Sequence, residues 1–266
     1  MPNELGTKDF EANERTRIFL QPIAGASILG LFAYAATLFV MGAQYGHWFG
    51  APAGGAEPSY FIGAFVALVG GVAQFAAAMW AFRARDGLST AFNGIWGSFL
   101  MAFGVLNLLF ETGVIPTTAA TAALPSVGMW FIMLAFVSGA CALAALASNF
   151  ALFATMVLAT ASSALMGIGA LAGGNPETMA VAGYLFMISA IIAWYTGGAA
   201  MIADTYGHAV LPVGEFRTSR EAEEVSSGIG EPGVLHGQWR GYNKRRPGHG
   251  ELEEPVKEYT GAGSSL

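Results

Sequence analysis

The sequence predicts an all-α integral membrane protein with six transmembrane helices. Of its 266 residues, 54% are hydrophobic and 11% are charged, whereas soluble domains carry about 25% charged residues. A chain this apolar requires a lipid environment. Most charged residues lie in the first 17 residues or in the tail, and those between Ile18 and Leu211 are Glu57, Arg83, Arg85, Asp86, Glu111, Glu177 and Asp204.

Six apolar runs account for the predicted spans. Each is long enough to cross a hydrocarbon core of about 30 Å as a helix. The first run is much longer than the apolar region of a signal peptide, about 7–15 residues, so we expect it to remain as a helix. Glycines recur in the runs, and in lipid such small residues let helices approach closely. The runs cover approximately residues 22–46, 60–82, 91–111, 127–147, 149–171 and 180–203.

The basic residues predict the orientation of these spans, because Lys and Arg are concentrated on the cytoplasmic side of a membrane. All 12 Lys and Arg residues lie in the N-terminal segment, the 83–90 loop or the C-terminal tail. The connections at 47–59, 112–126 and 172–179 contain none. Six spans bring the three basic segments to one face. We therefore predict a multi-pass protein of the plasma membrane with both termini in the cytoplasm.

This topology divides the chain into three parts. A cytoplasmic N-terminal segment covers residues 1–20, and the transmembrane domain covers residues 21–212. The cytoplasmic tail, residues 213–266, is rich in Gly, Pro, Ser and charge. With few aliphatic residues to bury, it is predicted to be disordered unless it binds a partner protein.

Several functional classes find no support in the sequence. The single cysteine, Cys141, cannot form a disulfide within the chain, and no His or Cys cluster has the spacing of metal ligands. We expect no metal and no cofactor. No nucleophile–base pair suggests an enzyme, and the few basic residues form no stripe that would bind nucleic acid.

The polar residues inside the apolar runs are uncharged, and they are candidates for a substrate pathway. Ion-coupled pumps usually carry a charged residue in the membrane, whereas a neutral pathway suits a small solute that is neutral or briefly desolvated. Gln21, with Pro22, opens the first run, where free N–H groups of a helix start can attract a carboxylate. Ordinary helix capping is the favoured explanation of that position. The other candidates are Gln74, Asn93, Ser98 and Thr155.

Trp96 differs from the tryptophans that lie near the predicted interfaces. It falls within the third run, between Gly94 and Gly97. A bulky side chain that points into a pore can act as a hydrophobic gate. Lipid contact and core packing are the alternatives.

Several short motifs resemble the succinate-acetate permease family of acetate channels and transporters. The resemblance covers about residues 20–215 and implies six helices around a pore in each protomer, assembly as a homo-hexamer, and acetate, succinate or a related small carboxylate as the solute. The motifs are Gly70-Gly71-Val72-Ala73-Gln74-Phe75, Gly97-Ser98-Phe99, Gly174-Asn175-Pro176, Ala193-Trp194-Tyr195 and the segment TYGHAVLPVGE at residues 205–215.

The resemblance also implies roles for individual residues. It places Gln74 beside the substrate path, and Trp96 at a tyrosine of the family's hydrophobic constriction. The other two constriction positions fall on Leu31, with Phe32 adjacent, and on Leu158 or Ala159.

These observations predict a membrane channel or transporter for acetate and related short-chain carboxylates, with proton coupling left open. Two departures from the family pattern leave the solute undetermined: tryptophan replaces the tyrosine at Trp96, and the first-helix signature retains only its first proline, Pro22. One alternative is a pore for a small neutral solute such as an undissociated acid, ammonia or CO2. The other is a structural membrane subunit that does not transport and whose tail binds partners.

Overall fold

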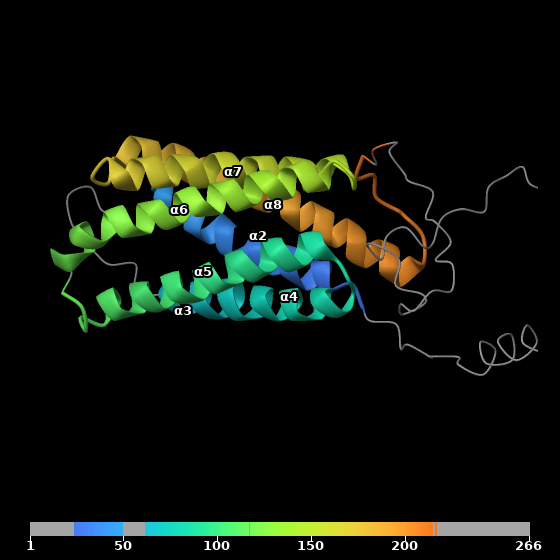
Figure 1. Ribbon diagram of the computed structural model, residues 1–266, viewed down its shortest axis with the longest axis horizontal. Helices are drawn as coiled ribbons and strands as arrows, with labels where there is room; N and C mark the ends of the chain where they lie inside the picture. The colour runs from blue at the N-terminus through green and yellow to red at the C-terminus, as the bar shows by residue number, and fades with distance from the viewer. Residues whose placement is uncertain (1–23, 50–61, 117, 215, 217–266) are drawn as a thin grey trace, which may run out of the picture.

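A computed structural model describes residues 24–49, 62–116, 118–214 and 216. In this part of the chain all regular structure is helical, and six helices are long and apolar enough to cross a membrane. The predicted all-α membrane fold is therefore confirmed. The spans run side by side along the long axis of the molecule (Figure 1).

The second span is built from three consecutive helical segments, of which the middle one is a π-helix. The π-helical turn is wider than an α-helical turn and is often found at functional sites. Its segments are α3 (Ile62–Phe65), η1 (Val66–Ala73) and α4 (Gln74–Arg83). The other spans are α2 (Ala26–Tyr45), α5 (Gly87–Glu111), α6 (Thr118–Ala145), α7 (Phe150–Leu171) and α8 (Pro176–Tyr206).

The six spans close into a ring. Helix α2 packs against α8 and against α4, and α5 packs against η1 and α4. On the other side α7 packs between α6 and α8. The sparser contact between α5 and α6 completes the ring, so every span presents one face to a common centre.

Two helices begin several residues earlier in the chain than hydropathy predicts, because a side chain caps each of them at its start. The Asp86 carboxylate accepts a hydrogen bond from the Ser89 backbone N–H at 3.0 Å, and α5 begins at Gly87 instead of 91. The Asn175 side chain likewise caps α8, which begins at Pro176. Caps of this kind satisfy the free N–H groups at a helix start.

Glycine allows the second and third spans to touch through their backbones. A Cβ atom on Gly97 would lie 2.6 Å from the backbone nitrogen of Phe75 and 3.0 Å from the carbonyl oxygen of Gly71. No larger side chain fits at this crossing without moving a helix. The glycines of the Gly70-Gly71 and Gly97 motifs therefore fix the distance between η1, α4 and α5.

After α8 the chain turns back onto the start of α7. The backbone N–H groups of Phe150 and Ala151 donate to the carbonyl oxygens of Gly214 and Val213, at 2.7 and 3.1 Å. These bonds satisfy N–H groups that would otherwise be free at the start of α7. We call residues 208–214 the return segment.

The return segment is also held to α8, because the Tyr195 hydroxyl donates to the carbonyl oxygen of Pro212 at 2.7 Å. Val213 is buried, so the packed part of the chain continues beyond residue 212, where the sequence places the tail boundary. The N-terminal segment 1–20 and the tail from 217 onward, with its predicted partner binding, lie outside the described residues.

Candidate transport pathway

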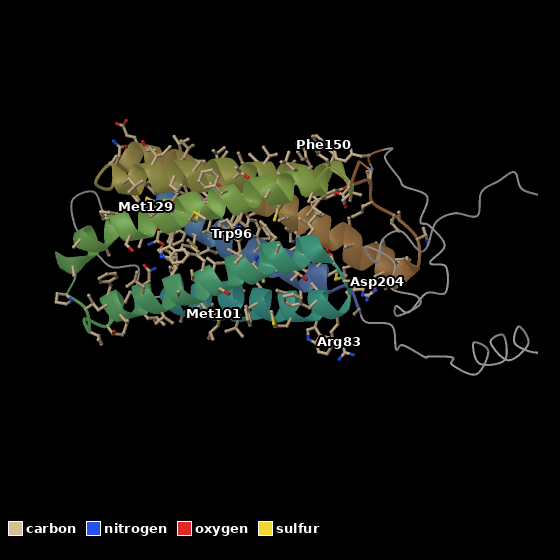
Figure 2. The ribbon with its side chains drawn as sticks, in the orientation of Figure 1. Arg83, Trp96, Met101, Met129, Phe150 and Asp204 are labelled. Carbon is tan, nitrogen blue, oxygen red and sulfur yellow. The ribbon has the colours of Figure 1, made fainter. Side chains whose placement is uncertain are left out.

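Aromatic side chains from α2, α5, α6 and α8 fill the centre of the ring. Trp96 of α5 is fully buried and lies inside the bundle (Figure 2). Its ring centroid lies 5.4 Å from that of Tyr34 and 6.1 Å from that of Phe186, each at an interplanar angle of 88°. These are favourable edge-to-face contacts. We call the whole group the aromatic cluster; it comprises Tyr34, Phe92, Trp96, Phe99, Phe103, Phe131 and Phe186.

The indole nitrogen of Trp96 has a hydrogen-bond partner on α6, the neighbouring span. It donates to the hydroxyl of Ser138 on α6 at 3.0 Å, and both residues are fully buried. Of the alternatives open for Trp96, lipid contact is thereby excluded. The side chain points to the centre of the helix ring.

A second buried hydrogen-bond chain lies beside the aromatic cluster. The Ser189 hydroxyl donates to the carbonyl oxygen of Thr155 at 3.0 Å. Because the Ser189 proton is used in that bond, the Tyr34 hydroxyl, 3.0 Å away, is the donor to Ser189. This chain joins α2, α8 and α7 and holds the Tyr34 ring against Trp96.

Two buried amides meet between α2, α4 and α5. Gln74 Nε2 donates to Asn93 Oδ1 at 3.3 Å, whereas Gln74 Oε1 is buried without a hydrogen-bond partner. The amides fit here because residue 30 is a glycine: a Cβ at Gly30 would lie 2.5 Å from the Asn93 side-chain amide. We call Gln74 and Asn93 the amide pair.

A cavity of about 140 Å³ lies between α5 and α6, near the C-terminal end of α5. Its lining is mostly apolar, with Asn107 as a polar member. Phe103 and Phe131 belong both to this lining and to the aromatic cluster. Along α5 the order is Asn93, Trp96 and Phe103, so the amide pair and the cavity lie on opposite sides of Trp96.

The sequence profile of the GPR1/FUN34/yaaH family matches residues 9–218. The chain belongs to this family. Its fold is similar to a solved structure of the bacterial acetate channel SatP, with a TM-score of 0.63 and 20% sequence identity over 73% of this chain and 100% of that chain. At that identity the similarity shows the fold alone.

The family match covers the motifs that carry the resemblance, and it confirms the assignment to the succinate-acetate permeases. No curated protein matches the sequence. The chain is thus a multi-pass membrane protein with the fold of an acetate channel.

The structure brings together some of the residues that the sequence and the family resemblance single out. Leu31 and Ala159 are buried in the same apolar core as Trp96. Phe32 and Leu158 are half-buried. Of the positions that the resemblance assigns to the constriction, Leu31, Trp96 and Ala159 therefore lie in one core, whereas Leu158, the alternative to Ala159, is only half-buried.

The predicted polar residues separate into different environments. Ser98 is exposed, and its hydroxyl donates to the carbonyl oxygen of Gly94 on its own helix, so it does not join the amide pair. Thr155 is buried, and its hydroxyl donates to the carbonyl oxygen of Ala151 at 2.9 Å. Gln21 lies outside the described residues.

Sequence reasoning did not single out most of the aromatic cluster. Phe92, Phe99 and Phe103 stand with Trp96 at intervals of four, three and four residues, which places them on one face of a helix and could have revealed the stripe. Ser138 and Ser189 gave no such signal. Their aromatic partners lie 42 and 155 residues away in the sequence.

The buried polar side chains of the described residues are all uncharged. No group of His, Cys, Asp or Glu in that part of the chain could hold a metal ion. The arrangement can therefore form hydrogen bonds to a small solute, but it offers no fixed charge to a solute in the centre.

Proposed function

We propose that this member of the GPR1/FUN34/yaaH family passes acetate and related short-chain carboxylates across the plasma membrane as a channel or transporter, and is not an enzyme. Support comes from the family and from the fold shared with an acetate channel. The observation that carries the proposal is the series of cavity, aromatic cluster and amide pair within one closed ring of helices.

This series fits the chemistry of an acetate-sized solute. Such a solute needs hydrogen-bonding groups for its carboxyl group and an apolar surface for its methyl group. The amide pair provides the first, and Trp96 with Leu31 and Ala159 provides the second. In this assignment Trp96 forms the constriction, and Phe32 and Leu158 lie at its edge.

The constriction is closed in this conformation, because Trp96 has no exposed surface. An apolar constriction excludes water when its side chains are in contact. A solute passes when the aromatic rings move apart, and the Trp96–Ser138 hydrogen bond is the contact that must yield between α5 and α6.

Uptake of labelled acetate into proteoliposomes, with and without a pH gradient, tests this function. Saturable, proton-dependent uptake identifies a carrier, whereas linear uptake indifferent to the gradient identifies a channel. Ser98→Ala is a suitable control, because Ser98 lies outside the series and is expected to leave uptake unchanged. Uptake no faster than in protein-free liposomes contradicts the proposal.

The closed aromatic cluster also favours a rival, in which the protein is a structural membrane subunit. The Trp96 N–H is fully satisfied by Ser138, as expected of a permanent core. A structural subunit gives no uptake of any solute. The same assay therefore separates the two functions.

A further inference from the structure

We propose that the cavity between α5 and α6 binds a small uncharged aromatic molecule that carries one hydroxyl group, of the size of phenol, and that this ligand inhibits transport. The binding site follows from the cavity alone. The inhibition rests on the proposed function, because it requires that a solute pass through the centre of the ring.

The volume of the cavity sets the size of its ligand. It measures about 140 Å³, close to the volume of an engineered apolar cavity of about 150 Å³ that stays dry and binds benzene. Acetate has four non-hydrogen atoms and benzene has six, so acetate leaves part of this space empty. Side chains from α2, α5, α6, α7 and α8 line the cavity. A ligand there can contact all of these spans.

The lining favours an aromatic ring. Phe103, Phe110 and Phe131 contribute three aromatic side chains, and Tyr45 contributes a fourth. The rings of Phe103 and Phe131 stand edge to face, with centroids 5.9 Å apart and an interplanar angle of 75°. Aromatic rings prefer such contacts, and a bound ring can extend them. The described residues that line the cavity include no charged side chain, so an ionised ligand would be buried there without a partner.

Asn107 and Tyr45 supply the polar groups of the cavity. Asn107 Nδ2 donates to the Phe103 carbonyl oxygen at 2.7 Å. This bond fixes the orientation of the amide, because an amide oxygen cannot donate. Asn107 Oδ1 and the Tyr45 hydroxyl have no hydrogen-bond partner among the described residues. Asn107 Oδ1 can therefore accept a hydrogen bond from a ligand hydroxyl, which gives phenol an advantage over benzene.

The position of the cavity indicates how such a ligand enters and what it blocks. Phe110 is half-buried and lies one residue before the end of α5, whereas Phe131 and Met166 are fully buried. The cavity therefore leads from the end of the bundle to the aromatic cluster. Phe103 and Phe131 belong to both. A bound ring packs against these side chains, which must move apart for a solute to pass, and holds the constriction closed.

Thermal unfolding in detergent, with and without phenol, tests the binding site. A ligand that binds only the folded protein raises the midpoint of unfolding. Ala123→Phe fills the cavity, because Ala123 belongs to its lining. Ala122→Phe is the matched control, because Ala122 is exposed and lies outside the lining. We expect phenol to raise the midpoint of the wild-type protein and of Ala122→Phe, but not that of Ala123→Phe.

A further variant tests the role of the hydroxyl group. Asn107→Leu keeps the approximate size of the side chain and removes the amide. The loss of one hydrogen bond is expected to weaken phenol binding about threefold to tenfold. Binding of fluorobenzene, which has the ring without the hydroxyl, is expected to stay the same. The dependence of the midpoint on ligand concentration gives both affinities, and this comparison decides the question even where Ala123→Phe does not fold.

Uptake of labelled acetate into proteoliposomes measures the inhibition. Phenol is expected to slow uptake by the wild-type protein. Asn107→Leu is expected to need about threefold to tenfold more phenol for the same effect. Protein-free liposomes at the same phenol concentrations measure any leak through the lipid.

Each contrary outcome has a distinct meaning. An equal change of the midpoint in the wild-type protein and both alanine variants overturns the binding site, because phenol then acts through the detergent. Equal phenol affinity of the wild-type protein and Asn107→Leu overturns recognition of the hydroxyl. Binding that does not slow uptake overturns the inhibition. If acetate enters no faster than in protein-free liposomes even without phenol, the proposed function fails, while the unfolding experiment still decides the binding site.

Discussion

The Trp96 indole donates a hydrogen bond to the Ser138 hydroxyl at 3.0 Å and links α5 to α6 at the centre of the ring. These helices are the neighbours with the sparsest contact, and the cavity lies between them. The bond therefore joins the two sides of the ring where it is most easily opened.

Ser138→Ala removes the acceptor of that bond and leaves a buried N–H unpaired. An unpaired buried donor usually lowers the free energy of unfolding by about 1–3 kcal/mol. Hydrogen bonds between membrane helices average about 0.6 kcal/mol, so we expect a loss near the lower of these values. Thermal unfolding in detergent measures the effect. Ser138→Thr keeps a hydroxyl and serves as the control; an equal loss in both variants would mean that packing, and not the hydrogen bond, is responsible.

Trp96→Ala is expected to widen the constriction and to raise butyrate uptake more than acetate uptake. Uptake of both labelled acids into proteoliposomes measures the change in selectivity. Removal of a fully buried aromatic side chain also costs about 3–5 kcal/mol, so folding must be checked in parallel by size-exclusion chromatography. Unchanged selectivity with a damaged fold would leave Trp96 as a packing residue.

Gly97→Ala is expected to lower the yield of folded protein, because the added methyl group would meet the backbone of α4 at 2.6 Å. Gly198→Ala is the matched control on another span, since no atom lies within 4 Å of a Cβ built there. Yield and thermal stability in detergent provide the measurement. Equal behaviour of the two variants would contradict the close helix crossing.

We propose that both termini lie in the cytoplasm, as the basic residues indicate. Reporter fusions after Glu57 and Thr117 are expected to report the outside of the membrane. Fusions after Arg85 and Glu215 are expected to report the inside. A C-terminal reporter on the outside would require an odd number of spans and would contradict the six-span topology.

We also propose that the protein assembles as a homo-hexamer. Large apolar side chains are exposed on the outer faces of the helices, including Phe136 and Leu143 of α6, where lipid or neighbouring protomers can cover them. Native mass spectrometry in mild detergent is expected to show six protomers. Monomers alone, over a range of protein concentrations, would count against the assembly.

The sequence predicted the spans well because membrane thickness imposes a minimum length on an apolar helix. It predicted their ends less well. The starts of α5 and α8 depend on the side chains of Asp86 and Asn175, which a hydropathy average does not weigh. The π-helical turn of η1 was not predicted either, because hydropathy carries no information on the hydrogen-bond register within a helix.

The candidate site was predictable as a list of residues but not as a geometry. Gln74 and Asn93 were both selected as buried polar residues, yet their pairing depends on the alignment of α4 against α5, which glycine contacts fix in three dimensions. Ser98 shows the converse. It is polar and lies in a motif, but the rotation of α5 turns it away from the centre.

The return segment has a mechanical consequence for everything that follows it in the chain. Its hydrogen bonds from Phe150 and Tyr195 fasten the root of the tail to two spans at once. Force applied through the tail would therefore act first on the start of α7 and on Tyr195 of α8. The return segment thus connects the chain beyond α8 to the two helices that carry Thr155 and Ser189.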